Sequence, residues 1–183
     1  ACAGTSTQFP TLTPTAAPST SAAPTDRGTS EPTVNPCVSC GTCPPNARIA
    51  DGTEVIEDEA FDGCTGLESI VIPDSVQFIG KKSFLECKHL KNVTMGSGVL
   101  SIGPQAFEGC PELTDVRIGE NVEIVGRRAF YENIALTSVV IPAGVNSVGD
   151  DVFQGCANMT SVDIQNTVIG NRMFYECTGL RDV

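Results

Sequence analysis

Apolar residues recur along the chain with a fixed spacing from about residue 46 onward. The most regular of them are phenylalanines, of which five stand 23 residues apart and a sixth follows after 21: Phe61, Phe84, Phe107, Phe130, Phe153 and Phe174. Four further positions keep the same register, one of cysteine or asparagine, one of leucine or methionine, and two of mainly valine or isoleucine. A period in the twenties, kept at so many positions, is typical of a solenoid whose repeats, called rungs below, stack on one another.

The order of residues within a rung predicts its local structure. In residues 67–73, Ile70 and Ile72 alternate with Ser69 and Val71, which is the pattern of a short strand with one buried face. Pro or Gly follows this strand in four rungs and predicts a turn (Pro73, Gly96, Gly119 and Pro142). We expect a helical turn that ends at the phenylalanine to close each rung. The predicted fold is a right-handed superhelix with one short parallel strand and one short helical turn per rung.

These positions also carry a resemblance. The run LxxVxIPxxVxxIGxxAFxxC resembles the 23-residue BspA-like, treponemal-type leucine-rich repeat over residues 49–183. The resemblance implies a leucine-rich-repeat solenoid in a cell-surface or secreted protein that serves adhesion or protein recognition, without catalysis or a cofactor. The chain departs from the pattern at Asn133, at Met159 and in the shortened fifth rung, where we expect the stack to kink or tighten. Because Leu180 and Val183 begin another repeat, we expect the natural solenoid to continue beyond them.

Two segments precede the repeats. Thr, Pro, Ala and Ser fill 25 of the positions 1–36, so this segment cannot bury enough apolar area to offset the entropy of ordering it. We expect a disordered stalk there, of the composition found in O-glycosylated spacers. Residues 37–48 are rich in cysteine and are predicted to be a junction or an N-terminal cap over the first rung.

The nine cysteines form two groups. Five of them occupy one repeat position (Cys64, Cys87, Cys110, Cys156 and Cys177), where stacked residues point in parallel, so we expect free, buried thiols that stabilise turns. The other four are candidates for disulfides in a secreted protein (Cys2, Cys37, Cys40 and Cys43). A zinc site at the second group is the alternative, but zinc needs four ligands and only Cys2 or a carboxylate could supply the fourth.

The net charge of the chain limits the classes of partner that it can bind. The net charge of -11 and the pI near 4.4 would repel nucleic acid and anionic membranes, and the chain has no apolar run long enough for a membrane helix. The only histidine, His89, is expected to be a solvated turn residue, and the sequence contains no GxSxG, HExxH or glycine-rich phosphate-binding motif. In four rungs a pair of like charges, such as Asp150 with Asp151, stands three and two residues before the phenylalanine. These pairs indicate a structural surface column, with Arg127 and Arg128 opposite Asp150 and Asp151 in the preceding rung.

Two surfaces are candidates for binding a protein or glycoprotein ligand. The first is the concave face formed by outward strand residues, of which Arg117 most resembles an energetic anchor: Ser69, Val71, Asn92, Thr94, Asp115, Arg117, Ser138, Val140, Ser161 and Asp163. The second is a flank patch that could equally be part of the core: Phe78, Leu85, Ile124, Tyr131 and Tyr175. Sequons at Asn92 and Asn158 are candidate N-glycosylation sites, and a glycan on Asn92 would block the first surface.

The prediction from sequence is therefore a non-catalytic binding or adhesion module that is extracellular or on a cell surface, with no nucleic-acid partner and no direct membrane insertion. Two alternatives stay open. The repeats could form an architectural coat or spacer without a dedicated ligand, or an accessory recognition domain of an enzyme or receptor whose other domain is absent from this chain.

Overall fold

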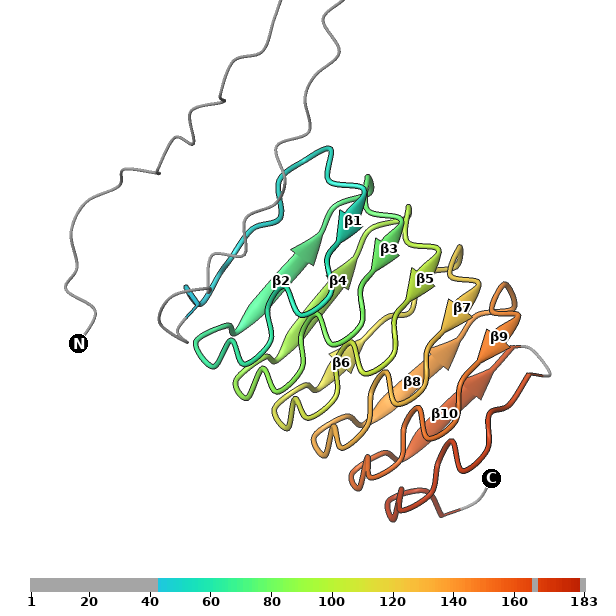
Figure 1. The fold of residues 1–183 in the computed structure, drawn as a ribbon. Helices are drawn as coiled ribbons and strands as arrows, with labels where there is room; N and C mark the ends of the chain where they lie inside the picture. Colours follow the sequence, from blue (N-terminus) through green and yellow to red (C-terminus); the bar gives the residue numbers. More distant parts are fainter. Residues whose placement is uncertain (1–42, 166–167, 182–183) are drawn as a thin grey trace, which may run out of the picture. The chain divides into compact units, whose positions relative to one another are not determined.

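The computed structural model describes residues 43–165 and 168–181, which form a parallel solenoid built from two columns of strands (Figure 1). The first column contains the strands predicted from the repeat, β2 (Ser69–Ile72), β4 (Asn92–Met95), β6 (Asp115–Val116), β8 (Ser138–Ile141) and β10 (Ser161–Ile164). The second contains the two-residue strands β1 (Val55–Ile56), β3 (Phe78–Ile79), β5 (Ser101–Ile102), β7 (Ile124–Val125) and β9 (Ser147–Val148). All strand pairs are parallel and join equivalent strands of neighbouring rungs, and β6 and β8 are the one neighbouring pair of described strands that is not joined.

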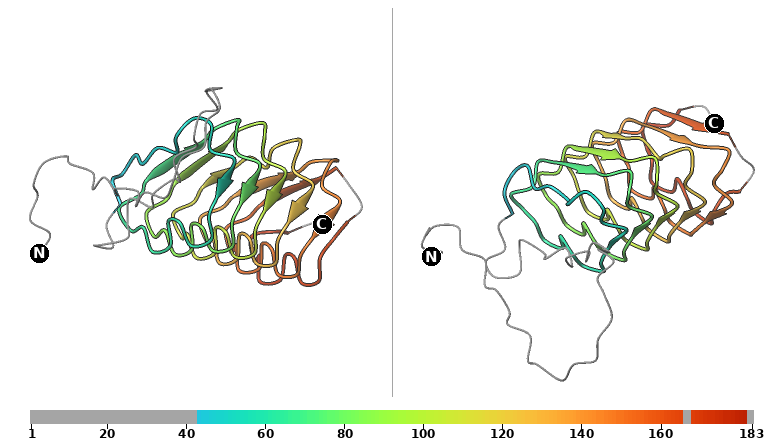
Figure 2. Two further views of the ribbon diagram at one scale, coloured as in Figure 1. Left: turned by 45° about the horizontal axis from the view of Figure 1, so that its top comes forward. Right: turned by 90° about the horizontal axis from the view of Figure 1, so that it is seen from above.

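The second column was not predicted from the sequence. Its strands are too short for an alternating pattern to stand out, because each contributes one outward and one inward residue. The strands are nevertheless hydrogen-bonded without a break in the order β1-β3-β5-β7-β9. Figure 2 shows the two columns as separate walls of the stack.

The core between the walls is the one expected from the repeat pattern. Inward residues of both columns, such as Ile72 and Ile102, are buried, and the phenylalanine rings stack along the solenoid axis. Adjacent ring centroids lie between 4.9 and 5.7 Å apart, and the rings are parallel to within 6°. Phe174, at the end of the stack, is only partly buried because no described ring covers its far side.

The helical turn expected before each phenylalanine is wrong, since residues 43–165 and 168–181 contain no helix. Positive φ values interrupt the segment two residues before and two residues after the phenylalanine, as at Lys82 (56°) and Glu86 (54°). The backbone N–H groups there donate along the stack instead, from Lys82 to the oxygen of Pro104 and from Phe84 to the oxygen of Ala106. The segment is a series of turns whose hydrogen bonds join neighbouring rungs.

The first column is interrupted in its middle. Its strands form a three-stranded ladder, β2-β4-β6, and a separate two-stranded ladder, β8-β10. β6 ends at Val116, whereas β4 runs to Met95. A Cβ added at Gly96 would meet the backbone of Pro73 at 2.5 Å, but one added at the equivalent Gly119 would meet nothing closer than 3.8 Å. The third rung therefore packs less tightly here than the second.

The cysteine position stabilises the turns by hydrogen bonding. The thiols of Cys87, Cys110, Cys156 and Cys177 are free and buried, and each donates to the carbonyl oxygen of the phenylalanine in the preceding rung, at 3.1 to 3.4 Å. Asn133 makes the same bond from its amide nitrogen to Phe107 at 3.0 Å. The neighbouring Cys110 thiol and burial raise the pKa of Cys87, so this thiol stays protonated and able to donate.

Cys64 was expected to be free, and this expectation is wrong. It forms a disulfide with Cys43, with a Cα–Cα distance of 5.2 Å. Cys64 belongs to the first rung, so no phenylalanine of an earlier rung offers its thiol an acceptor as in the later rungs. The stalk at 1–36 and the cysteines at positions 2, 37 and 40 lie outside the described residues. Residues 43–49 pack on the first rung, with a parallel bridge between Arg48 and Val71.

Candidate functional site

The outward face of the first column carries the residues predicted for the concave binding face. Nine of the ten are exposed, and Ser69 is half-buried with its hydroxyl donating to the Asn46 side chain at 3.0 Å. The interruption after β6 divides this face, and Arg117 lies just beyond the end of that strand. Among the ten, only Val71 and Thr94 line one of the hollows described below.

The residues of the predicted flank patch lie on two different elements. Phe78 and Ile124 are 47% and 45% exposed on the outward face of the second column. Leu85, Tyr131 and Tyr175 lie in the turns after the phenylalanines, where Leu85 and Tyr131 are half-buried and Tyr175 is exposed. The guanidinium of Arg128 lies over the Tyr131 ring at 4.7 Å from its centroid. The described contacts do not join these two groups into one patch.

Both sequons are accessible. Asn92 is exposed on β4, and Asn158 is exposed in the turn before β10. Both positions stay candidates for glycosylation.

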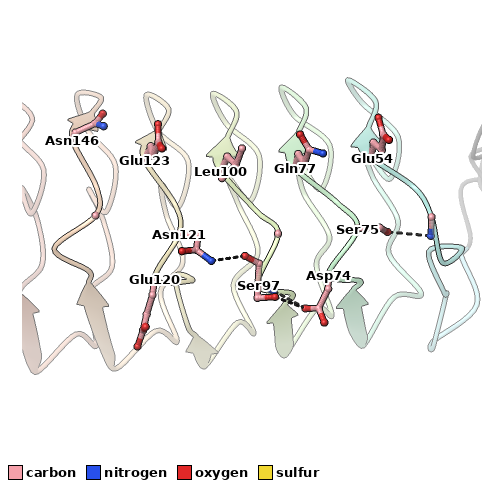
Figure 3. Close-up of a pocket in the computed structure, with 13 residues that line it drawn as sticks. Glu54, Asp74, Ser75, Gln77, Ser97, Leu100, Glu120, Asn121, Glu123 and Asn146 are labelled. Carbon is pink, nitrogen blue, oxygen red and sulfur yellow. Dashed lines mark hydrogen bonds between the residues drawn. The ribbon is translucent and has the colours of Figure 1, made fainter.

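A hollow follows the corner between the two columns, and it was not predicted from the sequence. It has a volume of about 810 Å³ and is lined by residues from five consecutive rungs, from Gly52 to Asn146. Figure 3 shows one row of side chains where the second-column strands begin: Glu54, Gln77, Leu100, Glu123 and Asn146. We call this hollow the corner groove.

One repeat position in the lining of the corner groove holds mostly small residues. These residues are Gly52, Ser75, Gly98, Asn121 and Gly144. A smaller hollow adjoins it over the ends of β2 and β4 and shares Gly52, Asp74 and Ser75 with it. The signal in the sequence was this row of small residues with polar positions on either side, but only the fold shows that the row lies in a corner.

Hydrogen bonds between rungs hold one wall of the corner groove in place. Oδ1 of Asp74 accepts from the backbone N–H of Ser97 at 2.7 Å and from its hydroxyl at 3.0 Å. These two bonds lower the pKa of Asp74. The amide of Asn121 donates to the carbonyl oxygen of Ser97 at 2.8 Å, as the dashed lines in Figure 3 show.

A second cluster of charges lies in the turns near the C-terminal end. The expectation that Asp151 is a surface residue is wrong, because its side chain is fully buried between rungs. Nη2 of Arg127 lies 3.2 Å and Nε of Arg128 3.6 Å from its Oδ2, while Nη2 of Arg172 lies 2.9 Å from its Oδ1. The predicted pairing of Arg127 and Arg128 with this acidic position is present. The carboxylate therefore joins the fifth rung to the rungs on both sides.

The charge cluster predicts a pH dependence. Burial opposes ionisation of Asp151, but the hydrogen bond from Arg127 and the charges of Arg172, Arg127 and Arg128 hold its pKa below the usual 3.8. A lowered folded-state pKa contributes stability above the unfolded-state value, and this stability is lost as the pH falls below about 3.8. In urea unfolding, the stability difference between the chain and Asp151→Asn should stay constant from neutral pH down to about pH 4 and shrink below it. A difference that is already lost between about pH 6 and 5 would contradict this.

The remaining features of the described residues concern metal ligands, the histidine and apolar helices. No group of three or more His, Cys, Asp or Glu side chains in the described ranges is arranged to hold a metal ion. His89 is exposed in its turn, with Nδ1 2.9 Å from Oε1 of Glu112. No helix in this part of the structure is long and apolar enough to cross a membrane.

Known structures share this architecture. A leucine-rich cell surface protein from Faecalibacterium prausnitzii is 27% identical, with a TM-score of 0.66 over 69% of this chain and 34% of that one. A leucine-rich repeat protein from T. pallidum is 22% identical (TM-score 0.65), covering 76% of this chain and 79% of the other. One from Bacteroides ovatus is 24% identical (TM-score 0.63), covering 78% and 42%. The chain thus spans only about a third of the length of the Faecalibacterium protein. No curated protein matches.

The family assignment agrees with the resemblance seen in the repeat pattern. The model of the BspA type leucine rich repeat region matches in six copies over residues 54–181. This range covers more than half of the chain and includes all but the first part of the described solenoid. The chain therefore belongs to the BspA-type leucine-rich-repeat family.

Proposed function

We propose that this solenoid is a non-catalytic module that recognises a protein ligand outside the cell, and that the corner groove and the sheet faces beside it form the binding surface. The observation that carries the proposal is the groove itself, which takes side chains from five consecutive rungs and therefore offers an extended surface rather than a compact pocket. Extended surfaces built one repeat at a time are what solenoids use to bind other proteins.

The proposed location has two supports. The fold is that of leucine-rich-repeat surface proteins, and the similar Faecalibacterium protein is described as a cell surface protein. The disulfide between Cys43 and Cys64 also suits an oxidising compartment, because disulfides are rare in reducing ones. A coat or spacer without a ligand is the second candidate, and the interrupted, small-residue face of the first column favours it.

The proposal is tested by screening the purified chain against an array of extracellular proteins and glycoproteins. We expect at least one ligand whose binding is weakened by Gln77→Arg, which places a long side chain at the groove. Asn158→Arg is the matched control, since Asn158 is exposed in a turn outside the groove lining. Failure to bind any ligand, together with self-association of the chain in light scattering, would favour the coat or spacer instead.

A further inference from the structure

We propose that the corner groove binds an extended, cationic segment of the protein ligand, in which two basic side chains stand four residues apart with an apolar side chain between them. This inference rests on the proposed function, because it names the kind of ligand that the same groove would recognise. It is argued below from the charge of the groove, the exposed apolar residues beside it and the spacing of its rungs.

The charge of the corner groove is one-sided. Four of its thirteen lining residues are acidic, namely Glu54, Asp74, Glu120 and Glu123, and none is basic. Glu54, Glu120 and Glu123 are exposed, and their carboxylates have no ion pair with any residue that the structure describes. A concave surface lined by one sign of charge concentrates the field and attracts the opposite charge. Charge complementarity therefore favours a cationic ligand and disfavours an acidic one.

Three exposed apolar residues lie beside the row that contains Glu54 and Glu123. Val55, Phe78 and Ile124 occupy the outward positions of β1, β3 and β7, and each immediately follows a groove residue in the chain. Phe78 is in register with Val55 on one side and with Ser101 on the other, and Ser101 is in register with Ile124. The small Ser101 leaves the Phe78 ring accessible from that side, and aromatic rings of this kind are frequent anchors in interfaces. A ligand with only basic side chains would leave these apolar residues uncovered.

The spacing of the rungs sets the spacing in the ligand. Glu54 and Glu123 occupy equivalent positions three rungs apart, which corresponds to about 14 Å at a strand spacing of about 4.8 Å. An extended chain that runs along the groove covers about 13 Å in four residues, and residues i, i+2 and i+4 point to the same side. Basic side chains at i and i+4 can therefore face Glu54 and Glu123 together. The side chain at i+2 then lies between Gln77 and Leu100, near Phe78.

The test uses a synthetic peptide of seven residues with blocked ends, Lys at positions 1 and 5, Leu at position 3 and Ser elsewhere. Binding to the full chain is measured by fluorescence anisotropy at about 50 mM salt, where charge attraction is weakly screened. We expect a Kd of about 1 mM or lower at this salt concentration. Binding should be much weaker at about 500 mM salt. The double variant Glu54→Gln and Glu123→Gln should weaken binding about tenfold, which corresponds to the loss of two exposed ion pairs.

Matched controls separate this site from general attraction to an acidic protein. The variant Glu112→Gln with Glu132→Gln changes the net charge equally in turns outside the groove lining, and it should leave the affinity within about twofold. A peptide with the same composition but Lys at positions 1 and 4 puts the two charges on opposite sides and should bind more weakly. Phe78→Ser should weaken binding of the Leu peptide and have little effect on one with Ser at position 3.

Three results would overturn the inference: no binding of the Lys peptide, equal weakening by the two double variants, or equal binding of the two Lys spacings. These failures are distinct from failure of the proposed function. A protein ligand from the array that still depends on Gln77 would keep the recognition function while excluding a cationic extended segment as its determinant. If the array yields no ligand as well, both proposals fail.

Discussion

Replacing Phe107 by alanine is expected to lower the free energy of unfolding by about 3 to 5 kcal/mol. The ring is fully buried in the middle of the phenylalanine stack, 4.9 Å from the centroid of Phe84 and 5.4 Å from that of Phe130. Its removal leaves a cavity that the neighbouring rungs cannot close, because their backbones are tied to one another by hydrogen bonds on both sides of the ring. Urea unfolding followed by circular dichroism measures the change.

Phe78 provides the control for this prediction. The same substitution there removes a ring that is 47% exposed on the outward face of β3, so the loss should stay below about 1 kcal/mol. If Phe107→Ala cost no more than Phe78→Ala, the phenylalanine stack would not be the core of the solenoid.

Replacing Asn133 by alanine is expected to cost about 2 to 4 kcal/mol, because a buried group left without a hydrogen bond costs about 1 to 3 kcal/mol. The buried amide joins two rungs. Its oxygen accepts from the backbone N–H of Cys110 at 2.9 Å, and its nitrogen donates to the carbonyl oxygen of Phe107 at 3.0 Å. Alanine would leave both backbone groups unpaired in the core. Thermal and urea unfolding of the variant measure the loss.

Asn133→Cys is the matched variant, since cysteine occupies this position in the other rungs and its thiol makes the same bond to the phenylalanine carbonyl. We expect it to retain most of the stability that Asn133→Ala loses. Equal losses in the two variants would show that the side chain fills space here rather than joining the rungs.

The repeat pattern alone was sufficient to predict the core. The positions of Phe84, Leu90 and Ile102 are set by burial, which acts in the same way in each rung and so leaves a periodic trace in the sequence. The repeat position of Asn133 is also periodic, because the asparagine amide and the cysteine thiol of other rungs donate the same hydrogen bond to a phenylalanine carbonyl oxygen. A periodic sequence pattern therefore predicts the features that all rungs share.

The sequence pattern did not predict features that occur in a single rung or that depend on how the rungs are arranged in space. The β3 strand has too few residues for an alternating pattern. Lys82 and Glu86 have positive φ values, but lysine and glutamate are not residue types that predict a left-handed conformation. Asp151 occupies the repeat position of Glu59, which is exposed, but it is buried among the arginines of the neighbouring rungs, so its burial could not be predicted from the residue itself. The corner groove depends on the angle between two strand columns, which no single rung encodes.

The disulfide between Cys43 and Cys64 has a mechanical consequence. A pulling force that enters the chain ahead of Cys43 passes through the sulfur atoms to Cys64 and bypasses the 20 residues between them. The separation of 21 positions corresponds to about 70 Å of extended chain, and this length cannot be drawn out while the covalent link is intact. Tension is instead delivered to the turn beside Phe61, where the aromatic stack begins. The first rung thus acts as a fixed anchor point, and unravelling under load has to start in the rungs behind it.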